Sequence, residues 1–275
     1  MKSTYILLLI VLILVTGCSQ TAAEVQPTEQ PLKTDIPLSP TNTPEPILTS
    51  TPSPPTDTPE PTATATRESS PTPDIPKEAV TISYDEQVIR GILVGEGDIA
   101  VVLAPMYGES RGSWMHFAEH IASLGYAALA FDFPGPFGTS SGTFKFDGVQ
   151  FDVLAVIDFL RQRGYERIVC MGASIGGTAC FEAALLDPTL AGFVNISSPI
   201  EKTSEELSIL LMPKLIVISD DDEFDVSPLN DVFELLPAPK QIEFINKRGH
   251  GTELLTMGNE LQDILVAFLD SLQDL

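Results

Sequence analysis

Ser174 is the residue whose surroundings most favour chemistry in this sequence. It lies in the segment Gly172-Ala173-Ser174-Ile175-Gly176, between a short apolar run at 167–171 and a helical pattern at 178–186. A serine on such a strand-to-helix turn is typical of a nucleophile, because the flanking glycines let the strand and the helix approach closely. The free N–H groups of the helix also favour negative charge beside the serine. The alternative is an ordinary glycine-rich turn, but the strand before it and the helix after it favour the nucleophile.

Two later loops carry the acid and the general base that a serine nucleophile requires. The apolar strand pattern at 215–218 is followed by the acidic loop Ser219-Asp220-Asp221-Asp222-Glu223-Phe224-Asp225. The last strand pattern, at 241–246, is followed by His250 between two glycines. A solvated turn or a calcium loop is the alternative for the acidic loop, but the EF-hand pattern needs glycine where Asp225 stands. The two loops follow the serine in the order acid and then histidine, and this order supports a catalytic interpretation of both.

These motifs resemble those of the α/β-hydrolase superfamily, in particular its small members near the dienelactone hydrolases and acyl esterases. The resemblance spans roughly residues 79–275 and includes the segment 126–140, which is similar to the strand and loop written D-x-R-G-x-G-x-S, with Pro134 where arginine is common. Asp132 and Ser140 of this segment are expected to hydrogen-bond the backbone of the loop. The resemblance therefore implies a hydrolase that uses a catalytic triad.

The resemblance also implies which side chains form the triad. Ser174 is the nucleophile and His250 is the base that takes its proton. The family places its acid most often at the fourth position of the acidic loop, which is Asp222, with Asp221 and Asp225 as rivals. We therefore expect the catalytic residues Ser174, Asp222 and His250.

Two backbone N–H groups are expected to form the oxyanion hole. In the family a strand ends in His-Gly-X, and the N–H of X is the first donor; here Pro105 and Met106 replace the first two residues, and Tyr107 takes the place of X. The second donor is the N–H of Ile175, which directly follows the nucleophile Ser174. Pro105 departs from the family pattern at this loop.

The elements around these residues predict an α/β fold with a mostly parallel central sheet and helices on both faces. Only about 18 residues separate the strand patterns at 190–196 and 215–218, so the sequence leaves no room for a large lid domain. Further strands are predicted at 80–84, 88–94, 99–104 and 241–246, and helices at 112–124, 149–163 and 253–272.

One helix carries a possible metal motif. His116, Glu119 and His120 spell H-x-x-E-H, and the two histidines lie one turn apart, where they could share a metal ion. The simpler interpretation is a solvated face beside the apolar stripe of the same helix, and no third ligand is evident. We therefore expect neither a metal site nor an organic cofactor.

The first 78 residues predict export and attachment to a membrane. The apolar core Tyr5–Val15 has 11 residues, which is too short for a comfortable span and typical of a signal peptide at residues 1–17. Val15-Thr16-Gly17-Cys18 resembles a bacterial lipobox, so we expect Cys18 to carry lipid at the bacterial cell envelope. The alternatives are a plain secretory signal or an uncleaved anchor. Residues 18–78 hold 14 of the 23 prolines and predict a disordered Thr/Pro-rich linker before the hydrolase domain at 79–275.

The cysteine content does not indicate a disulfide framework. The chain has three cysteines, and Cys170 and Cys180 are interpreted as packed thiols on the strand and the helix beside the nucleophile.

Charge and composition narrow the function further. A formal net charge of −23 over 275 residues argues against binding to nucleic acid. We expect a monomer that cleaves a small or medium carboxylic ester through an acyl-enzyme. The alternatives are a peptidase or another C–N or C–O hydrolase with the same triad, and a surface binding protein that keeps the fold without turnover.

Overall fold

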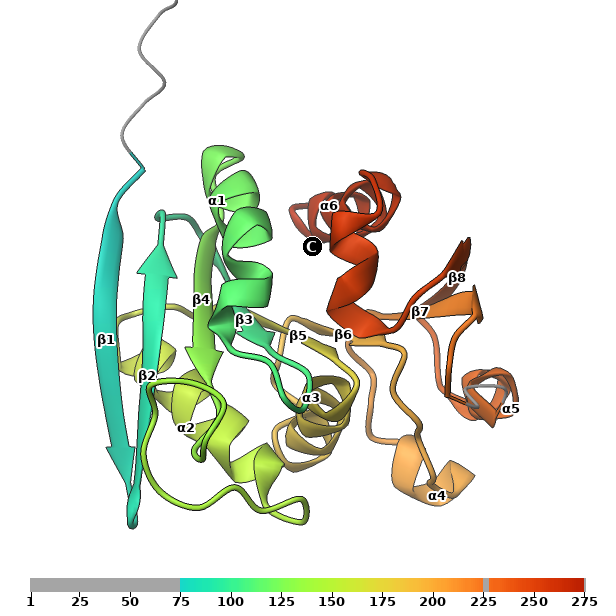
Figure 1. The fold of residues 1–275 in the computed structure, drawn as a ribbon. Coiled ribbons are helices and arrows are strands. Elements are labelled where there is room, and N and C mark those ends of the chain that lie inside the picture. Colours follow the sequence, from blue (N-terminus) through green and yellow to red (C-terminus); the bar gives the residue numbers. More distant parts are fainter. Residues whose placement is uncertain (1–74, 225–227, 275) are drawn as a thin grey trace, which may run out of the picture. The chain divides into compact units, whose positions relative to one another are not determined.

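Eight strands form one sheet in the part of the chain that the computed structural model describes, residues 75–224 and 228–274 (Figure 1). The strand order is β1-β2-β4-β3-β5-β6-β7-β8. β1 pairs antiparallel with β2, β2 pairs antiparallel with β4, and all later pairings are parallel. The predicted α/β class with a mostly parallel sheet is therefore confirmed.

The strands follow the apolar runs of the sequence. Those in the centre are buried along their length, because parallel strands with helices on both faces have no solvent side. Their bounds are β1 Lys77–Tyr84, β2 Gln87–Val94, β3 Ile99–Ala104, β4 Ala127–Asp132, β5 Arg167–Ala173, β6 Gly192–Ile196, β7 Lys214–Asp221 and β8 Lys240–Arg248.

Helices cover both faces of the sheet, and each face has its own apolar core (Figure 1). On one face α1 (Met115–Ser123) and α6 (Glu260–Leu272) pack on the sheet, and on the other α2 (Val149–Gln162) and α3 (Ile175–Leu186) do so. The predicted helix at 112–124 begins as the 3-10 turn η1 (Arg111–Trp114). No helix among the described residues is long and apolar enough to cross a membrane.

Short elements connect the later strands. The segment 197–213 between β6 and β7 holds only the four-residue helix α4 (Ser204–Leu207), so this connection contains no lid domain. The helix α5 (Pro228–Leu235) follows β7 and packs Leu229 and Val232 into the core that α2 and α3 share. The sequence pattern does not predict a helix at either position.

The closing helix is interrupted, which corrects the expectation of one helix over 253–272. The 3-10 helix η2 (Gly251–Thr256) ends before α6 begins at Glu260. Gly258 lies between them with φ of 120°, a conformation that ends a right-handed helix and is open to glycine at little cost. The break lets the chain turn between the loop of His250 and the helix that covers the sheet.

A carboxyl group is buried where α2 begins. Asp152 is 3% exposed and accepts a hydrogen bond from the hydroxyl of Tyr84 at the end of β1. Burial raises the pKa of Asp152 from its ordinary value of 3.8 to about 6, although the Tyr84 hydrogen bond and the charge of Lys145 act in the opposite direction. Burial also raises the pKa of Tyr84. This position therefore favours the neutral carboxylic acid.

We expect Asp152→Asn to stabilise the domain near pH 8 and to have little effect near pH 4. Because folding raises the pKa of Asp152, the folded state binds more protons than the unfolded chain between these values. The stability that this group contributes is present below about pH 4 and is lost as the pH rises through about 6, by roughly 3 kcal/mol. Asparagine keeps an acceptor for Tyr84 and does not ionise.

The measurement is the difference in Tm between variant and wild type at the two pH values. Asp158→Asn, at an exposed position on the same helix, is the control and should change Tm little at either pH. An Asp152→Asn effect that is equal at both pH values would contradict the prediction.

Candidate active site

Ser174 lies on the turn between β5 and α3 and has a backbone conformation that side chains rarely adopt. Its φ is 51° and its ψ is −124°. Such a conformation costs on the order of 1–3 kcal/mol and persists only where the surrounding structure determines it. The N–H of Ser174 donates to the carbonyl of Ile196 at the end of β6, at 2.9 Å. The strand-to-helix turn that the sequence predicts is therefore present, and it is strained at the serine.

The turn is tight because Gly172, Gly176 and Gly177, on either side of Ser174, have no side chains. A Cβ at Gly172 would overlap the carbonyl of Gly176 and lie 2.6 Å from the nitrogen of Gly177. Real Cβ atoms do not approach backbone this closely. The start of α3 can therefore lie directly on the end of β5.

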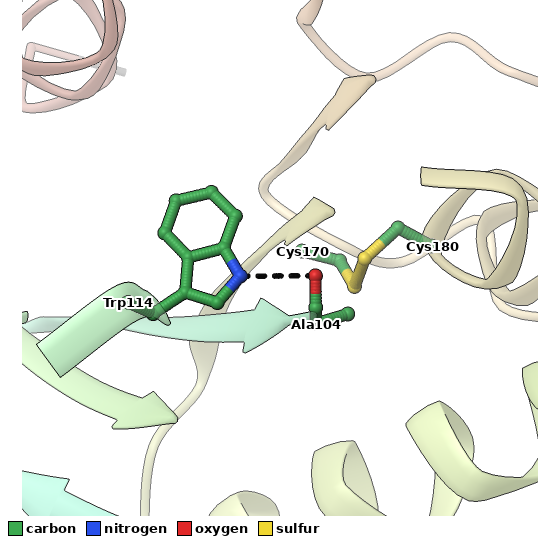
Figure 2. Close-up of a disulfide and its surroundings, with 4 residues drawn as sticks. All are labelled: Ala104, Trp114, Cys170 and Cys180. Carbon is green, nitrogen blue, oxygen red and sulfur yellow. Dashed lines mark hydrogen bonds between the residues drawn. A yellow bond between two sulfur atoms is a disulfide. The ribbon is translucent and has the colours of Figure 1, made fainter. Parts of the chain in front are cut away.

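The end of β3 completes this contact. A Cβ at Gly176 would overlap the carbonyl of Ala104 and lie 2.7 Å from the carbonyl oxygen of Pro105. The buried indole N–H of Trp114 donates to the same Ala104 carbonyl at 3.1 Å (Figure 2). Trp114 thus fixes the strand end against which the turn is packed, a role that the sequence did not reveal.

Asp222 and His250 are hydrogen-bonded to each other beyond the ends of β7 and β8. Asp222 Oδ1 lies 2.8 Å from His250 Nδ1, and the two side chains are 1% and 8% exposed. The same oxygen accepts the backbone N–H of Phe224 at 3.0 Å, and the Phe224 ring lies 4.6 Å from the imidazole, centre to centre. Of the two rival carboxylates, Asp221 is exposed and Asp225 lies outside the described residues. The structure thus pairs His250 with Asp222.

The loop that carries His250 is held from both sides. The backbone N–H of His250 donates to Glu253 Oε2, and the N–H of Glu253 donates to the carbonyl of His250, each at 3.1 Å. Gly251 has φ of 55°, and a Cβ there would overlap Met106 Sδ and lie 3.1 Å from Ala173 Cβ. The residue after His250 therefore contacts the residue before Ser174.

Ser174 and His250 come from neighbouring segments, but no hydrogen bond joins their side chains. His250 Nε2 is buried and has no hydrogen-bond partner among the described residues, and the same is true of Asp222 Oδ2. With Nδ1 turned toward Asp222, Nε2 is the nitrogen that can accept a proton. Contacts of this kind often form or shorten only when substrate binds.

The predicted oxyanion donors lie on the two turns that meet at Gly176. Tyr107 lies in a turn that is closed by a hydrogen bond from Glu109 N–H to the Met106 carbonyl, at 3.2 Å. Ile175 is the first residue of α3, where backbone N–H groups have no partner inside the helix. The catalytic role of both N–H groups stays a prediction.

An exposed aromatic cluster lies beside the turn of Tyr107 and was not recognised from the sequence. The Tyr107 ring lies 4.8 Å from Phe137, 5.4 Å from Phe144 and 5.2 Å from Phe146, between ring centroids. Tyr107 is 52% exposed and Phe146 is 63% exposed. The phenylalanines all belong to the loop after β4, so the signal was present as Phe-rich spacing in 133–146. Exposed aromatic surface at a site favours an apolar ligand.

The loop after β4 is fixed by Asp132, as the sequence predicts. Its carboxylate accepts the backbone N–H groups of Arg111 at 2.8 Å and of Thr139 at 2.7 Å, and it also pairs with the Arg111 guanidinium. The Ser140 hydroxyl donates to the Asp132 carbonyl at 2.6 Å and accepts the N–H of Arg90 at 2.8 Å. The structural roles predicted for Asp132 and Ser140 are confirmed, whereas the part of Arg111 was missed.

Cys170 and Cys180 form a disulfide, which corrects their interpretation as packed thiols (Figure 2). Their Cα atoms lie 5.5 Å apart, within the roughly 4.4–6.8 Å that a disulfide spans. The turn at Ser174 folds α3 back on β5, and this brings together two cysteines whose distance could not be derived from spacing alone. Closing a loop of this length stabilises the fold by about 3 kcal/mol in the chain-entropy model.

The H-x-x-E-H motif lies on α1 away from these residues. Glu119 pairs with Lys77 of β1 at 2.7 Å, between Oε1 and Nζ. Within residues 75–224 and 228–274, no group of three histidine, cysteine, aspartate or glutamate residues is arranged to hold a metal ion. Glu119 thus has a surface partner, in keeping with a solvated face.

Comparison with known proteins agrees with this architecture. A family model described as alpha/beta hydrolase fold matches residues 99–229. No curated protein sequence matches the chain. The sheet order and the family match together show that this part of the chain has the α/β-hydrolase fold.

Several solved structures are similar to this one. They include an esterase from Pyrococcus furiosus, with a TM-score of 0.64 at 18% identity over 72% of this chain and 93% of the esterase. A dienelactone hydrolase from Anabaena variabilis has a TM-score of 0.57 at 20% identity over 66% of this chain and 94% of its own. A monoacylglycerol lipase from Paleococcus ferrophilus has a TM-score of 0.59 at 18% identity over 67% and 99%. At these identities the likeness is one of fold.

Proposed function

We propose that the protein is a serine hydrolase that cleaves carboxylic esters through an acyl-enzyme. The observation that carries the proposal is the buried pair of Asp222 and His250 beside a serine in a strained turn. His250 presents a buried Nε2 that has no hydrogen-bond partner within the described part of the chain, and its loop contacts Ala173, the residue before the serine. A binding protein has no need for this combination, because each of its parts costs stability.

In the proposed mechanism Ser174 Oγ attacks the carbonyl carbon of the ester while His250 Nε2 takes the serine proton. Asp222 holds the imidazole by Nδ1 and stabilises its charged form. The N–H groups of Tyr107 and Ile175 hold the negative oxygen of the tetrahedral intermediate. The C–O bond then breaks, and the alcohol leaves with the proton from His250. Water next attacks the acyl-enzyme with His250 as base, which releases the carboxylic acid and restores Ser174.

Hydrolysis of p-nitrophenyl esters by the full-length chain in detergent tests the proposal. We expect Ser174→Ala and His250→Ala to lower kcat by about 10⁴-fold or more, because the members of a triad act as a unit. Ser123→Ala and His116→Ala are matched controls on α1 and should retain activity. If wild type and all variants were folded and equally inert on esters, and on p-nitroanilides as amide counterparts, the proposal would be wrong. Turnover of the anilides alone would identify an amide hydrolase.

The exposed aromatic cluster supports an ester with an apolar acyl or alkyl group. Tyr107 lies two residues after Pro105, whose carbonyl lies against the turn of Ser174. The Phe146 ring lies 5.2 Å from the Tyr107 ring, and both rings are exposed. Covering such surface with a hydrocarbon chain is favourable by about 25 cal/mol per Å². The cluster thus favours medium-chain esters over acetate.

We expect Phe146→Ala to lower kcat/KM for a p-nitrophenyl octanoate by about tenfold and to leave the acetate ester within about twofold, since only the long chain reaches the ring. Phe151→Ala is the control, because this phenylalanine on α2 is also about half exposed and has no ring contact with Tyr107. An equal loss on both esters would instead assign Phe146 to the stability of the loop.

We also propose that the enzyme acts at the bacterial cell envelope, anchored by lipid on Cys18. The lipobox-like Val15-Thr16-Gly17-Cys18 supports this location. The disulfide between Cys170 and Cys180 supports it independently, because disulfides persist in oxidising compartments and are rare in the cytosol. Fractionation of the producing cell should place the protein with membranes, and recovery in the cytosol would reject the proposal.

A further inference from the structure

The disulfide between Cys170 and Cys180 encloses the strained turn at Ser174. Cys170 lies on β5 and Cys180 on α3, four residues before and six residues after the serine. A closed ring of covalent bonds therefore runs along the strand, through the turn and back from the helix. The ring contains both Ser174 and Ile175, whose N–H is a proposed oxyanion donor.

The start of α3 is held by close backbone packing and by the Thr178–Ser198 hydrogen bond at 2.8 Å, but not by a large buried side chain. Gly176, Gly177 and Ala179 are buried in its first turns, but their side chains are absent or small and remove little apolar area from water. The two glycines also lose more backbone conformational entropy on folding than other residues would. The side chain of Cys180 links this helix to β5 through the disulfide with Cys170. The large buried side chain of the helix, Phe181, follows only after this link.

The disulfide between Cys170 and Cys180 is buried inside the domain. Both cysteines are 0% exposed and belong to the core under α2 and α3. Thiol–disulfide exchange requires an attacking thiolate to reach one of the two sulfur atoms. Burial prevents this approach while the domain is folded. The disulfide therefore acts as a permanent part of the fold.

We infer that this disulfide is a positioning element for the nucleophile. It holds the start of α3 against β5, so that Ser174 keeps its strained conformation and Ile175 keeps its N–H directed toward the reacting carbonyl. Without the link, α3 can move away from the strand, and the turn relaxes toward an ordinary conformation. The inference rests on the proposed function of Ser174.

The double substitution Cys170→Ala with Cys180→Ala tests the inference without leaving a free thiol in the domain. The readout is the rate at which a fluorophosphonate labels Ser174, whose Oγ bonds to phosphorus as fluoride leaves. We expect labelling and kcat for a p-nitrophenyl ester to fall by about tenfold, since relaxing a strained backbone shifts populations by this order. KM should change by less than about twofold, because the aromatic cluster is untouched.

A matched control separates positioning from stability. Ile89→Ala removes a buried side chain on β2, distant in sequence and strand order from the turn, and should lower Tm as well. At a temperature well below both midpoints it should label at the wild-type rate. The wild-type chain made by cell-free synthesis, with and without a thiol reductant, gives the same comparison without substitution. Alkylation after denaturation then counts the free thiols.

The outcomes are distinct. Slower labelling of the double variant and of the reduced wild type, with Ile89→Ala unaffected, supports the inference. Equal labelling of oxidised and reduced wild type overturns it, while the proposed function stands. A folded wild-type chain that does not label at all overturns the proposed function, and the inference with it.

Discussion

Asp222→Asn is expected to lower kcat by about 10⁴-fold while leaving the fold intact. Asparagine has the same shape, but its amide cannot stabilise a charged imidazole. If the amide nitrogen faces His250, it also donates to Nδ1 and leaves the proton on Nε2, where the serine proton must be accepted. The side chain of Asp222 is 1% exposed, so water and dissolved ions cannot reach this position to stabilise the imidazolium instead. The measurement is kcat on a p-nitrophenyl ester, with Tm to show that the variant folds.

Asp221→Asn is the matched control for this experiment. Asp221 precedes Asp222 in the same acidic loop, carries the same charge and is exposed. We expect its variant to keep kcat within about threefold, because an exposed carboxylate is screened by water and salt. If Asp221→Asn lost as much activity as Asp222→Asn, the hydrogen bond between Asp222 and His250 would not be the one that supports catalysis.

Gly172→Ala is expected to have the largest effect on stability, with a loss of more than about 4 kcal/mol and little soluble protein. The added Cβ would overlap the carbonyl of Gly176 and lie 2.6 Å from the nitrogen of Gly177. Both neighbours are backbone atoms of α3, which cannot rotate away as a side chain can. To accept the methyl group, the helix would have to lift from the sheet and take Ser174 with it. Soluble yield and Tm are the measurements.

Gly148→Ala serves as the control for a glycine that is not crowded. Gly148 precedes α2 with φ of −132°, and a Cβ there would meet its nearest neighbour, Lys145 Cβ, at an ordinary 3.4 Å. We expect this variant to differ from wild type by less than about 1 kcal/mol. Near-wild-type Tm and activity in Gly172→Ala would show that α3 adjusts, and that the close approach is not required.

The sequence was sufficient to place the strands and to select the candidate site residues that follow them. Apolar β-branched runs bounded by glycine, proline and acidic residues predict the central strands. A strand that is buried on both faces has no solvent-facing positions, so nearly all of its residues are apolar. Ser174 and His250 could be selected because each lies directly after such a strand, and parallel strands bring their carboxyl ends to one edge of the sheet. The α/β class, its mostly parallel sheet and the lack of space for a lid followed from the same runs and their spacing.

Features that depend on distance between segments were decided only by the tertiary structure. Spacing left Asp221, Asp222 and Asp225 as candidates, and the hydrogen bond of 2.8 Å to His250 singles out Asp222 among the described residues. The sequence alone does not predict the Cys170–Cys180 disulfide, because a spacing of 10 residues does not say whether the strand and the helix bring the two side chains together.

The same limit applies to the residues around the site. Trp114 reads as an ordinary apolar helix residue, and its hydrogen bond to the Ala104 carbonyl exists only because the 3-10 helix η1 packs against β3. The rings of Tyr107 and Phe146 come from two loops that are far apart in the sequence and meet only in the folded structure. The sequence by itself determined which elements form and which side chains they carry, since periodicity and turn chemistry are local. Which of those side chains touch was decided by the packing of segments far apart in the chain, a property that no local pattern contains.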